Sequence, residues 1–518
     1  MRLHDYLEYW ARIRPEGEFA VLGDARLSYA EADAGANRIA NALMAAGLQL
    51  GDRVAYLSKN SLEFVLFYYG CSKCGAVPVP LNYRLAPPEW QFIVADAGAK
   101  LLFATSEFAG AIDGIRSELP SVKTWVSLGE GPEGWQGWQD FLGGAPETPP
   151  ERDASAESEL YQMYTSGTTG RPKGAVLLQR AVCQNLVQVG IQFSVRPGER
   201  SLIVAPLYHA AAGVCAFATV AAGGCLYVQE EFEPAAVVDA LSNETISVAL
   251  LVPAMIQFCL VAVPDVAERD YASLRLIVYG ASAIAEQTLR QAVSTFGCGF
   301  IQAYGMTETT AVATNLTIPD HERALREKPE LLLSAGRPVV GTRIRVVDEN
   351  DEDVPTGEIG EILIRGPQLM QGYWNREEAS AEALRGDWMH TGDAGVLDEE
   401  GYLYVQDRVK DMIISGAENI YPREIEEVLY LHEEVAEAAV IGVPDEKWGE
   451  SVKAIVVLKA GSSASPDEIM AFCAGRLGGY KRPRSVDFIE ALPRNLSGKV
   501  LKKDLREPYW RGHGRRVN

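Results

Sequence analysis

The chain has 518 residues, with 48 lysines and arginines against 70 aspartates and glutamates, and its formal net charge is −22. Because a single hydrophobic core stops growing at roughly 250–300 residues, this length predicts more than one domain. The acidic balance argues against nucleic-acid binding and favours a well-solvated globular protein.

Up to about residue 400, amphipathic helical patterns alternate with short apolar strands. This alternation predicts an α/β body in which helices cover both faces of parallel sheets. The expected helices and strands include Tyr29–Ala46, Arg53–Leu57, Ser61–Cys74, Ala76–Pro80, Leu202–Ala205, Gly224–Val228, Ser247–Val252 and Leu274–Tyr279.

One stretch, Ile246–Pro264, is almost free of charge and is the only candidate for a membrane span. A spanning helix needs about 20 uninterrupted apolar residues, and Pro253 interrupts this one. We therefore expect a buried strand, Ile246–Val252, followed by a short helix from Ala254. The start of the sequence also lacks the apolar segment of a secretory signal, so we expect a soluble chain.

The pattern changes after Val339. Thr342–Val347 and Gly360–Ile364 alternate in polarity around a turn-rich stretch, which predicts an antiparallel hairpin or small barrel. Charged residues at Asp407–Asp411 are typical of a linker. The rest predicts a small α+β domain built from Pro422–Leu431, Ala438–Ile441, Val452–Leu458 and Pro466–Leu477.

The C-terminal stretch is basic. From Ala471 onward there are twelve lysines and arginines against four acidic residues. Two interpretations stay open: a solvated surface with a basic tail, or a local attraction for phosphates of ATP or CoA, or for an anionic membrane surface. We expect at most a peripheral membrane contact.

The eight cysteines lack the spacing of a disulfide framework, which predicts reduced thiols and a cytoplasmic protein. Cys71 and Cys74 have C-x2-C spacing, but no second pair or paired histidines exist to complete a zinc site. They lie at the end of the apolar run Phe64–Lys73, so we expect buried thiols.

The segment Tyr164–Gly174 is the most specific in the chain. Between Thr165 and Gly170 it has two glycines and four hydroxyl residues, followed by Lys173. Such a run supplies backbone N–H donors in a concave loop that binds anions, and the lysine adds positive charge. It is not a Walker A loop, because Gly170 is followed by Arg-Pro rather than Lys-Ser/Thr.

This loop resembles the phosphate-binding signature of the acyl-adenylate-forming superfamily, which includes acyl-CoA synthetases, peptide-synthetase adenylation domains and firefly-type luciferases. Further motifs similar to those of the family follow in the family's order over nearly the whole chain. They are Pro206–His209, Gly280–Ser282, Gln302–Glu308, Trp388–Asp393, Asp407–Asp411 and Pro493–Lys499.

The resemblance implies the roles of the site residues. Lys499, Glu308, His209 and Thr165 would be catalytic, with Glu308 and Thr165 holding Mg²⁺. Tyr304 would stack on adenine, and Asp393 and Arg408 would hold the ribose. The implied ATP-binding set is Thr165, Ser166, Gly167, Thr168, Thr169, Lys173, Gly280, Ala281, Ser282, Gln302, Tyr304, Gly305, Thr307, Asp393, Arg408 and Lys499.

The resemblance also implies how the acid and coenzyme A are held. The implied acyl pocket is Tyr208, His209, Gly213, Gly305 and Met306, and the implied CoA tunnel is Ser415, Gly416 and Ala417. Related proteins often have Ser-Gly-Gly at this tunnel; if the third position needs φ > 0, Ala417 is strained.

The same resemblance predicts two domains that rotate against each other. Residues 1–407 would bind ATP and the acid, and residues 411–518 would form a mobile lid with its hinge at Lys410. Lys499 would face the site while the adenylate forms, and the tunnel residues would face it while the thioester forms.

Together these motifs predict an ATP-dependent acid–CoA ligase that forms an acyl-AMP and releases pyrophosphate and AMP. Its cofactors and partners would be Mg²⁺, ATP, CoA and a carboxylic acid; a homodimer is left open. Small residues at Ala210–Gly213 and Ala281–Ala285 favour a medium- or long-chain fatty acid. An aryl acid of cinnamate or benzoate type is the alternative, and a non-catalytic ATP-binding scaffold is a remote one.

Overall fold

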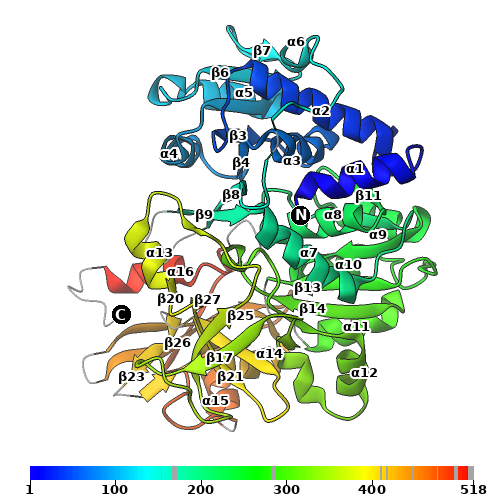
Figure 1. The fold of residues 1–518 in the computed structure, drawn as a ribbon. Coiled ribbons are helices and arrows are strands. Elements are labelled where there is room, and N and C mark those ends of the chain that lie inside the picture. Colours follow the sequence, from blue (N-terminus) through cyan, green and yellow to red (C-terminus); the bar gives the residue numbers. More distant parts are fainter. Residues whose placement is uncertain are drawn as a thin grey trace.

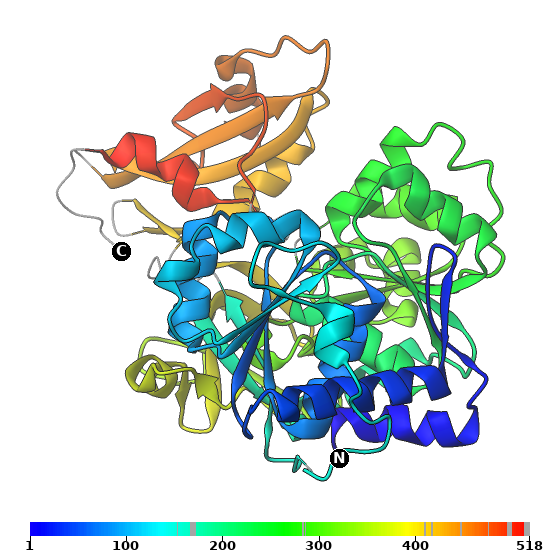
Figure 2. The same cartoon turned by 90° about the horizontal axis from the view of Figure 1, so that it is seen from above.

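The computed structural model describes residues 1–152, 154–165, 172–281, 284, 286–408, 411–415, 418–445, 448–474, 476–494 and 500–511. Figure 1 shows a body of stacked sheets and helices, and Figure 2 shows the residues after about 410 as a lobe of their own against it. The expected α/β body with a small barrel and an α+β C-terminal domain is confirmed.

The first sheet is parallel and has the order β4-β3-β5-β6-β7. Strand β3 is buried along its whole length, as expected where helices cover both faces. Helix α3 begins after Ser61, whose hydroxyl accepts from the Phe64 amide, and ends at Gly75 with φ 73°. The elements are α1 Leu3–Ile13, α2 Tyr29–Ala45, β3 Arg53–Leu57, α3 Leu62–Cys74, β4 Val77–Leu81, α4 Pro87–Ala97, β5 Leu101–Thr105, α5 Ser106–Asp113, β6 Thr124–Leu128, β7 Gln136–Gly137 and α6 Trp138–Leu142.

The second sheet has the order β16-β15-β14-β13-β12-β10-β11-β1-β2, parallel in its centre and antiparallel at both edges. Its elements are β1 Glu18–Leu22, β2 Ala25–Ser28, α7 Gln179–Phe193, β10 Arg200–Ile203, α8 Ala210–Ala221, β11 Cys225–Val228, α9 Pro234–Asn243, β12 Ile246–Leu250, α10 Pro253–Ala262, β13 Leu276–Gly280, α11 Glu286–Phe296, β14 Gly299–Tyr304, β15 Thr314–Leu316, α12 Ile318–Arg326 and β16 Arg337–Pro338.

Two predictions from the sequence are confirmed in these sheets. The uncharged stretch from residue 246 is strand β12 followed by helix α10, with Pro253 at the helix start, where no N–H is lost. No helix in the described ranges is long and apolar enough to cross a bilayer. Cys71 and Cys74 are buried free thiols, and burial raises the pKa of Cys74 to about 11.

Two antiparallel sheets complete the body. The smaller one, β19-β9-β8, consists of β8 Glu159–Thr165, β9 Lys173–Leu178 and β19 Gly372–Tyr373. The barrel-like sheet contains the expected hairpin β17–β18. Its elements are β17 Arg343–Val347, β18 Gly360–Arg365, α13 Glu377–Ala383, β20 Leu384–Arg385, β21 Trp388–Leu397 and β22 Leu403–Arg408.

The expected linker begins later than the charge pattern indicated. Asp407 and Arg408 belong to β22, where they pair with Ala394 and Asp393 of β21. Charged residues are common on such edge strands, because they prevent further strand pairing, so a charge cluster alone did not distinguish a linker from an edge.

The C-terminal domain folds around its own core. Its main hydrophobic cluster includes Ile413, Leu429, Val440 and Val456 and contains no residue of the body. We infer from this separation that the domain boundary lies between Arg408 and Asp411. The elements are β23 Ile413–Ser415, β24 Glu418–Ile420, α14 Pro422–Tyr430, β25 Val435–Asp445, β26 Gly449–Leu458, α15 Pro466–Ala474, β27 Ser485–Phe488 and α16 Lys502–Trp510.

Candidate active site

A cavity of about 920 Å³ lies where the two domains meet. The body lines it with residues of α7, α8, α10, α13, β8, β9, β12, β13, β14, β18, β19, β20, β21 and β22, and the C-terminal domain adds Asp411, Arg423, Glu426, Val500 and Lys502. Its volume falls in the range of about 300–1,000 Å³ that is typical of ligand sites. Most of the motifs singled out in the sequence therefore reach one cavity.

The two ends of the predicted phosphate-binding loop are held together by strand pairing. Thr165 ends β8 and is paired with Lys173 at the start of β9, and both residues line the cavity. The intervening Ser166, Gly167, Thr168 and Thr169 lie outside the described residues. The hairpin thus brings both ends of the predicted loop to the cavity.

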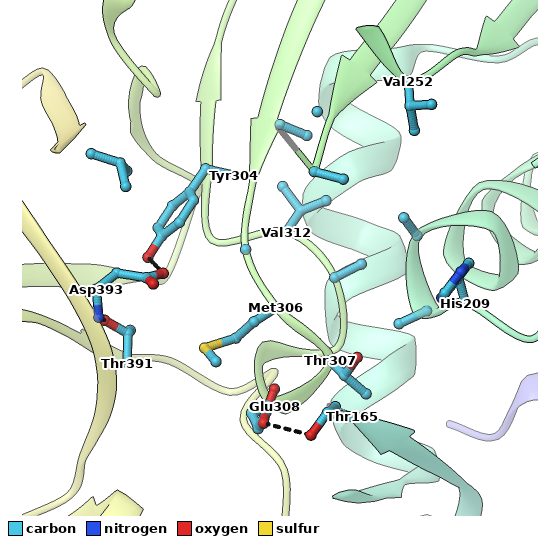
Figure 3. Close-up of a pocket in the computed structure, with 18 of the residues that line it drawn as sticks. Thr165, His209, Val252, Tyr304, Met306, Thr307, Glu308, Val312, Thr391 and Asp393 are labelled. Carbon is cyan, nitrogen blue, oxygen red and sulfur yellow. Dashed lines mark hydrogen bonds between the residues drawn. The ribbon is translucent and has the colours of Figure 1, made fainter. Parts of the chain in front are cut away.

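Glu308 lies in a tight turn after β14. The residue is only 4% exposed, and its Oε1 accepts a hydrogen bond from the Tyr373 hydroxyl at 2.8 Å. The same oxygen accepts from the Thr165 hydroxyl at 3.4 Å (Figure 3). The turn leaves no room for a side chain at Gly305, where an added Cβ would lie 2.1 Å from the Ala311 carbonyl oxygen. Sequence and backbone together therefore place a buried carboxylate in the cavity wall.

The side of the cavity where the nucleotide is expected is built from β13, β14 and β21. The Tyr304 hydroxyl donates to Asp393 Oδ2 at 2.9 Å (Figure 3). Gln302 also lines the cavity, and its buried Oε1 has no hydrogen-bond partner among the described residues. Gly280 ends β13, and Ala281 follows it in the left-handed region with φ 65°.

Two expected members of the nucleotide side are only partly defined. Ser282 lies outside the described residues, and Arg408 is described through its strand pairing with Asp393. Gly305, Met306 and Thr307 line the cavity between the nucleotide side and His209, as Figure 3 shows for Met306 and Thr307.

His209 precedes helix α8 and lines the opposite end of the cavity. Burial, assisted by the charge of Arg84, lowers its pKa to about 4, so the imidazole is neutral at pH 7. Its Nε2 has no hydrogen-bond partner in the described part of the chain. A neutral ring with an unused nitrogen can orient a polar substrate atom without adding charge.

Two expected residues of the acyl wall do not line the cavity. Tyr208 packs behind His209 against Tyr83, with ring centroids 5.6 Å apart, and Gly213 faces Phe217 within its own helix. Ala211 and Ala212, within the expected small stretch, line the cavity, and α8 and α10 add apolar residues that the sequence did not indicate: Val214, Cys215, Met255 and Phe258. The helical spacing of α8 predicted a buried helix but not which side faces a cavity.

The C-terminal domain faces the cavity with residues near the start of α14 and α16. Val500 lines the cavity, Lys502 pairs with Glu426 at 3.0 Å, and Arg423 donates to the Val405 carbonyl across the domain boundary. Lys499 itself, like Lys410, Gly416 and Ala417, lies outside the described residues. Ser415 is buried between β24 and β26 and does not line the cavity.

Comparison with known proteins agrees with this geometry. Residues 7–374 match the family described as AMP-binding enzyme, and residues 424–499 match the AMP-binding enzyme C-terminal domain. The chain is 39% identical to a fatty acid–[acyl-carrier-protein] ligase of Streptomyces coeruleorubidus, covering 96% of this chain and 95% of that protein. It is 40% identical to a feruloyl-CoA synthase of an Amycolatopsis species, covering 96% and 97%.

A solved structure extends the likeness to the whole fold. A Mycobacterium tuberculosis fatty acyl CoA synthetase superposes with a TM-score of 0.78 at 36% identity, over 98% of each chain. A nucleotide-sized cavity, a buried carboxylate and a paired Tyr–Asp at the nucleotide side are what an ATP-using enzyme of this kind needs. The chain belongs to the AMP-binding enzyme family and is an AMP-forming acid–thiol ligase of the acyl-CoA synthetase type.

Proposed function

We propose that this enzyme joins a medium- or long-chain fatty acid to coenzyme A through a fatty acyl-AMP. The observation that supports the substrate class is the apolar branch of the cavity. Every residue that α8, β12 and α10 contribute to the lining is apolar or small, from Ala210 to Cys215 and from Leu250 to Phe258.

No residue that α8, β12 and α10 contribute to the lining is charged, which disfavours an acid with a second charge among them, although Arg84 lines the cavity near His209. An amino acid or a dicarboxylic acid would bury a second charge there, and an unpaired buried charge costs several kcal/mol. A fatty tail, by contrast, gains about 0.8 kcal/mol for each buried CH₂. The branch reaches Met255 and Phe258 on α10, which supports an elongated rather than a short acid.

The residues of the site fit a magnesium ion that accompanies ATP. Such an ion is usually held by one or two carboxylates and the substrate phosphates. Glu308 supplies a buried carboxylate beside the Thr165 hydroxyl, and the described residues contain no cluster of three or more His, Cys, Asp or Glu that could form a cage. We assign Glu308 and Thr165 to this ion, whose charge would offset that of the phosphates.

The remaining nucleotide contacts follow from the cavity wall. We assign the loop from Thr165 to Lys173 to the phosphates, because its lysine and backbone amides supply positive charge. We assign Tyr304 to stacking against the adenine base. We assign the side-chain oxygen of Gln302 to accepting a hydrogen bond from the amino group of the base. Asp393 has the acceptor oxygens that the ribose hydroxyls need, and the Tyr304 hydroxyl holds it in place.

In the proposed first step, a carboxylate oxygen of the acid attacks the α-phosphorus of ATP and pyrophosphate leaves. Lys499 would offset the charge that builds on the α-phosphate, and His209 would orient the acid without protonating it. In the second step, the thiol of coenzyme A attacks the acyl carbonyl carbon, the acyl–phosphate bond breaks, and AMP leaves.

The domain arrangement supports assigning the first step to the state seen here. Val500 and Lys502, which follow Lys499 closely in the sequence, line the cavity. Ser415 is buried and does not line it. Rotation about Lys410 would exchange the two faces, as lid motions do in other enzymes. Ser415, Gly416 and Ala417 would then line the path of the thiol.

An aryl acid is the second candidate substrate. The feruloyl-CoA synthase that shares 40% identity supports it, because a flat aromatic acid is also apolar and uncharged beyond its carboxylate. The acyl-carrier-protein ligase at 39% identity likewise supports a carrier protein as a second candidate acceptor.

A single assay distinguishes these candidates. AMP release is measured with Mg²⁺ and ATP over a panel of fatty and aryl acids, each with coenzyme A, with a carrier protein, or with no acceptor. We expect the highest kcat/KM with a medium- or long-chain fatty acid and coenzyme A. A maximum with ferulate-type acids would favour the aryl alternative, and no acid-dependent release with any acceptor would refute the proposal.

A further inference from the structure

Tyr373 was not among the site residues expected from the sequence, yet its side chain joins two of them. Its hydroxyl donates to Glu308 Oε1 at 2.8 Å, and the Lys173 ammonium nitrogen lies 5.0 Å from the centroid of its ring. All three residues line the cavity. One tyrosine therefore contacts both the carboxylate assigned to the metal and the lysine assigned to the phosphates.

Strand pairing fixes the tyrosine backbone beside the phosphate loop. Tyr373 is paired with Ala175 of β9, and the Trp374 amide donates to the Gly174 carbonyl at 2.8 Å. The Tyr373 amide donates to the Ser380 hydroxyl at 2.8 Å. Backbone hydrogen bonds therefore hold Tyr373 beside β9, the strand that begins with Lys173.

The residues after Tyr373 are anchored to the N-terminal body. The Arg53 guanidinium stacks 3.4 Å from the Trp374 ring centroid, and Arg376 forms an ion pair with Asp96, which also accepts from the Tyr164 hydroxyl at 2.8 Å. These two contacts hold the segment that follows Tyr373 against the N-terminal body.

Both hydrogen bonds to the Glu308 side chain reach the same carboxyl oxygen. Both donors to Oε1, the hydroxyls of Tyr373 and Thr165, are neutral. No donor among the described residues bonds Oε2. Because neither donor carries a charge, the two hydroxyls orient the carboxyl group without adding a positive charge beside it, and Oε2 is left for a cation.

We propose that Tyr373 is a positioning residue: it holds Glu308 for the divalent cation that accompanies ATP, and it holds Lys173 beside the same phosphates. This inference rests on the roles proposed above for Glu308 and Lys173. It predicts that the tyrosine hydroxyl couples metal binding to ATP binding, while the ring acts on ATP binding even without metal.

The test measures equilibrium ATP binding to the full-length protein, once with Mg²⁺ and once with a chelator. Tyr373→Phe removes the hydroxyl and keeps the ring. We expect the gain in ATP affinity that Mg²⁺ provides to fall about tenfold, as is typical for a hydrogen bond to a charged group, while ATP affinity in the chelator stays unchanged.

Tyr271→Phe is the matched control, because it also removes a buried tyrosine hydroxyl hydrogen bond, to the Val266 carbonyl, and does not line the cavity. It should leave both affinities unchanged. Tyr373→Leu should additionally weaken ATP binding in the chelator, since Lys173 then loses its aromatic partner.

The inference would be overturned if Mg²⁺ raised the ATP affinity of Tyr373→Phe as much as it raises that of the wild type. It would also be overturned if the variant lost ATP affinity equally with and without Mg²⁺, which is the result expected of a purely structural residue. The proposed function fails separately. If the wild type couples Mg²⁺ to ATP binding through Tyr373 but shows no acid-dependent AMP release, the positioning role stands and the ligase assignment falls.

Discussion

At the scale of single residues, the site combines a buried imidazole that stays uncharged with a buried carboxyl group that two hydroxyls orient. His209 is held neutral by burial, whereas the Glu308 carboxyl group is oriented by the uncharged hydroxyls of Tyr373 and Thr165. This division suits adenylate formation, in which the acid must approach a phosphate without being protonated and the charge must be offset from the phosphate side.

Replacing Lys499 by alanine should reduce acid-dependent ATP–pyrophosphate exchange by at least about 100-fold, because charge on the α-phosphate is then no longer offset. ATP binding should be preserved. Lys503→Ala is the matched control, since Lys503 is an exposed lysine four positions further on. Exchange at the wild-type rate in Lys499→Ala would remove this lysine from the mechanism.

Three buried histidines predict a loss of stability in mild acid. Burial is the main cause that lowers the pKa values of His4, His209 and His321 from 6.5 to about 4. Below pH 6.5 these histidines therefore bind protons in the unfolded chain, whereas in the folded chain they stay neutral until about pH 4. Stability is therefore complete above pH 6.5 and falls as the pH decreases toward 4.

The measurement is the thermal unfolding midpoint between pH 7 and pH 5, where we expect a steady decrease. His209→Asn has no titrating ring at this position and should show a shallower decrease than the wild type. Parallel profiles for the two proteins would show that His209 does not contribute to the pH dependence.

At the scale of elements, the turn between β14 and β15 determines where Glu308 lies. The chain folds back so closely that Gly305 faces the Ala311 carbonyl, and the Met306 amide donates to the Thr309 hydroxyl at 3.0 Å. These close contacts between Gly305 and Ala311 shape the turn, and the position of the Glu308 side chain follows from them.

Gly305→Ala should displace this turn, because the new Cβ would lie 2.1 Å from a backbone oxygen that cannot move independently. Such overpacking typically costs about 1–3 kcal/mol of stability. We expect adenylate formation to fall at least tenfold, measured by pyrophosphate exchange at a temperature where the variant is folded.

Gly190→Ala is its control: the added Cβ has nothing within 4 Å in helix α7, so stability should be unchanged or slightly higher. Equal activity of Gly305→Ala and wild type would mean that the turn tolerates the shift and does not position Glu308.

At the scale of the whole molecule, two separately packed domains share one cavity. The body and the C-terminal domain have separate hydrophobic clusters, and the cavity between them is lined from both sides. A cavity shared across such a boundary can open and close without unfolding either core, which is the structural requirement for lid rotation.

Lys410→Pro should therefore separate the two half-reactions. Proline restricts the backbone at the proposed hinge, so adenylate formation should be retained and thioester formation should slow at least tenfold. Lys410→Ala keeps the backbone free and should leave both steps intact. The two rates are measured by pyrophosphate exchange and by acyl-CoA release; an equal loss of both in Lys410→Pro would contradict the hinge role.

Sequence reasoning was sufficient for the fold class, most elements and the family. Apolar periodicity located β3, α3 and the β17–β18 hairpin within a residue or two, because a buried strand or helix face must repeat its apolar residues. The motif residues Thr165, Glu308, Tyr304 and Asp393 could be named because each motif is local in sequence.

Contacts between distant segments were decided only by the tertiary structure. Tyr373 and Glu308 are 65 residues apart, and no spacing rule relates them. The same holds for three other findings. Helix α10 supplies part of the apolar wall, Tyr208 and Gly213 do not line the cavity, and Asp407 and Arg408 belong to a strand. Each depends on which surfaces pack together, and packing across a fold is not encoded in any local period or charge pattern.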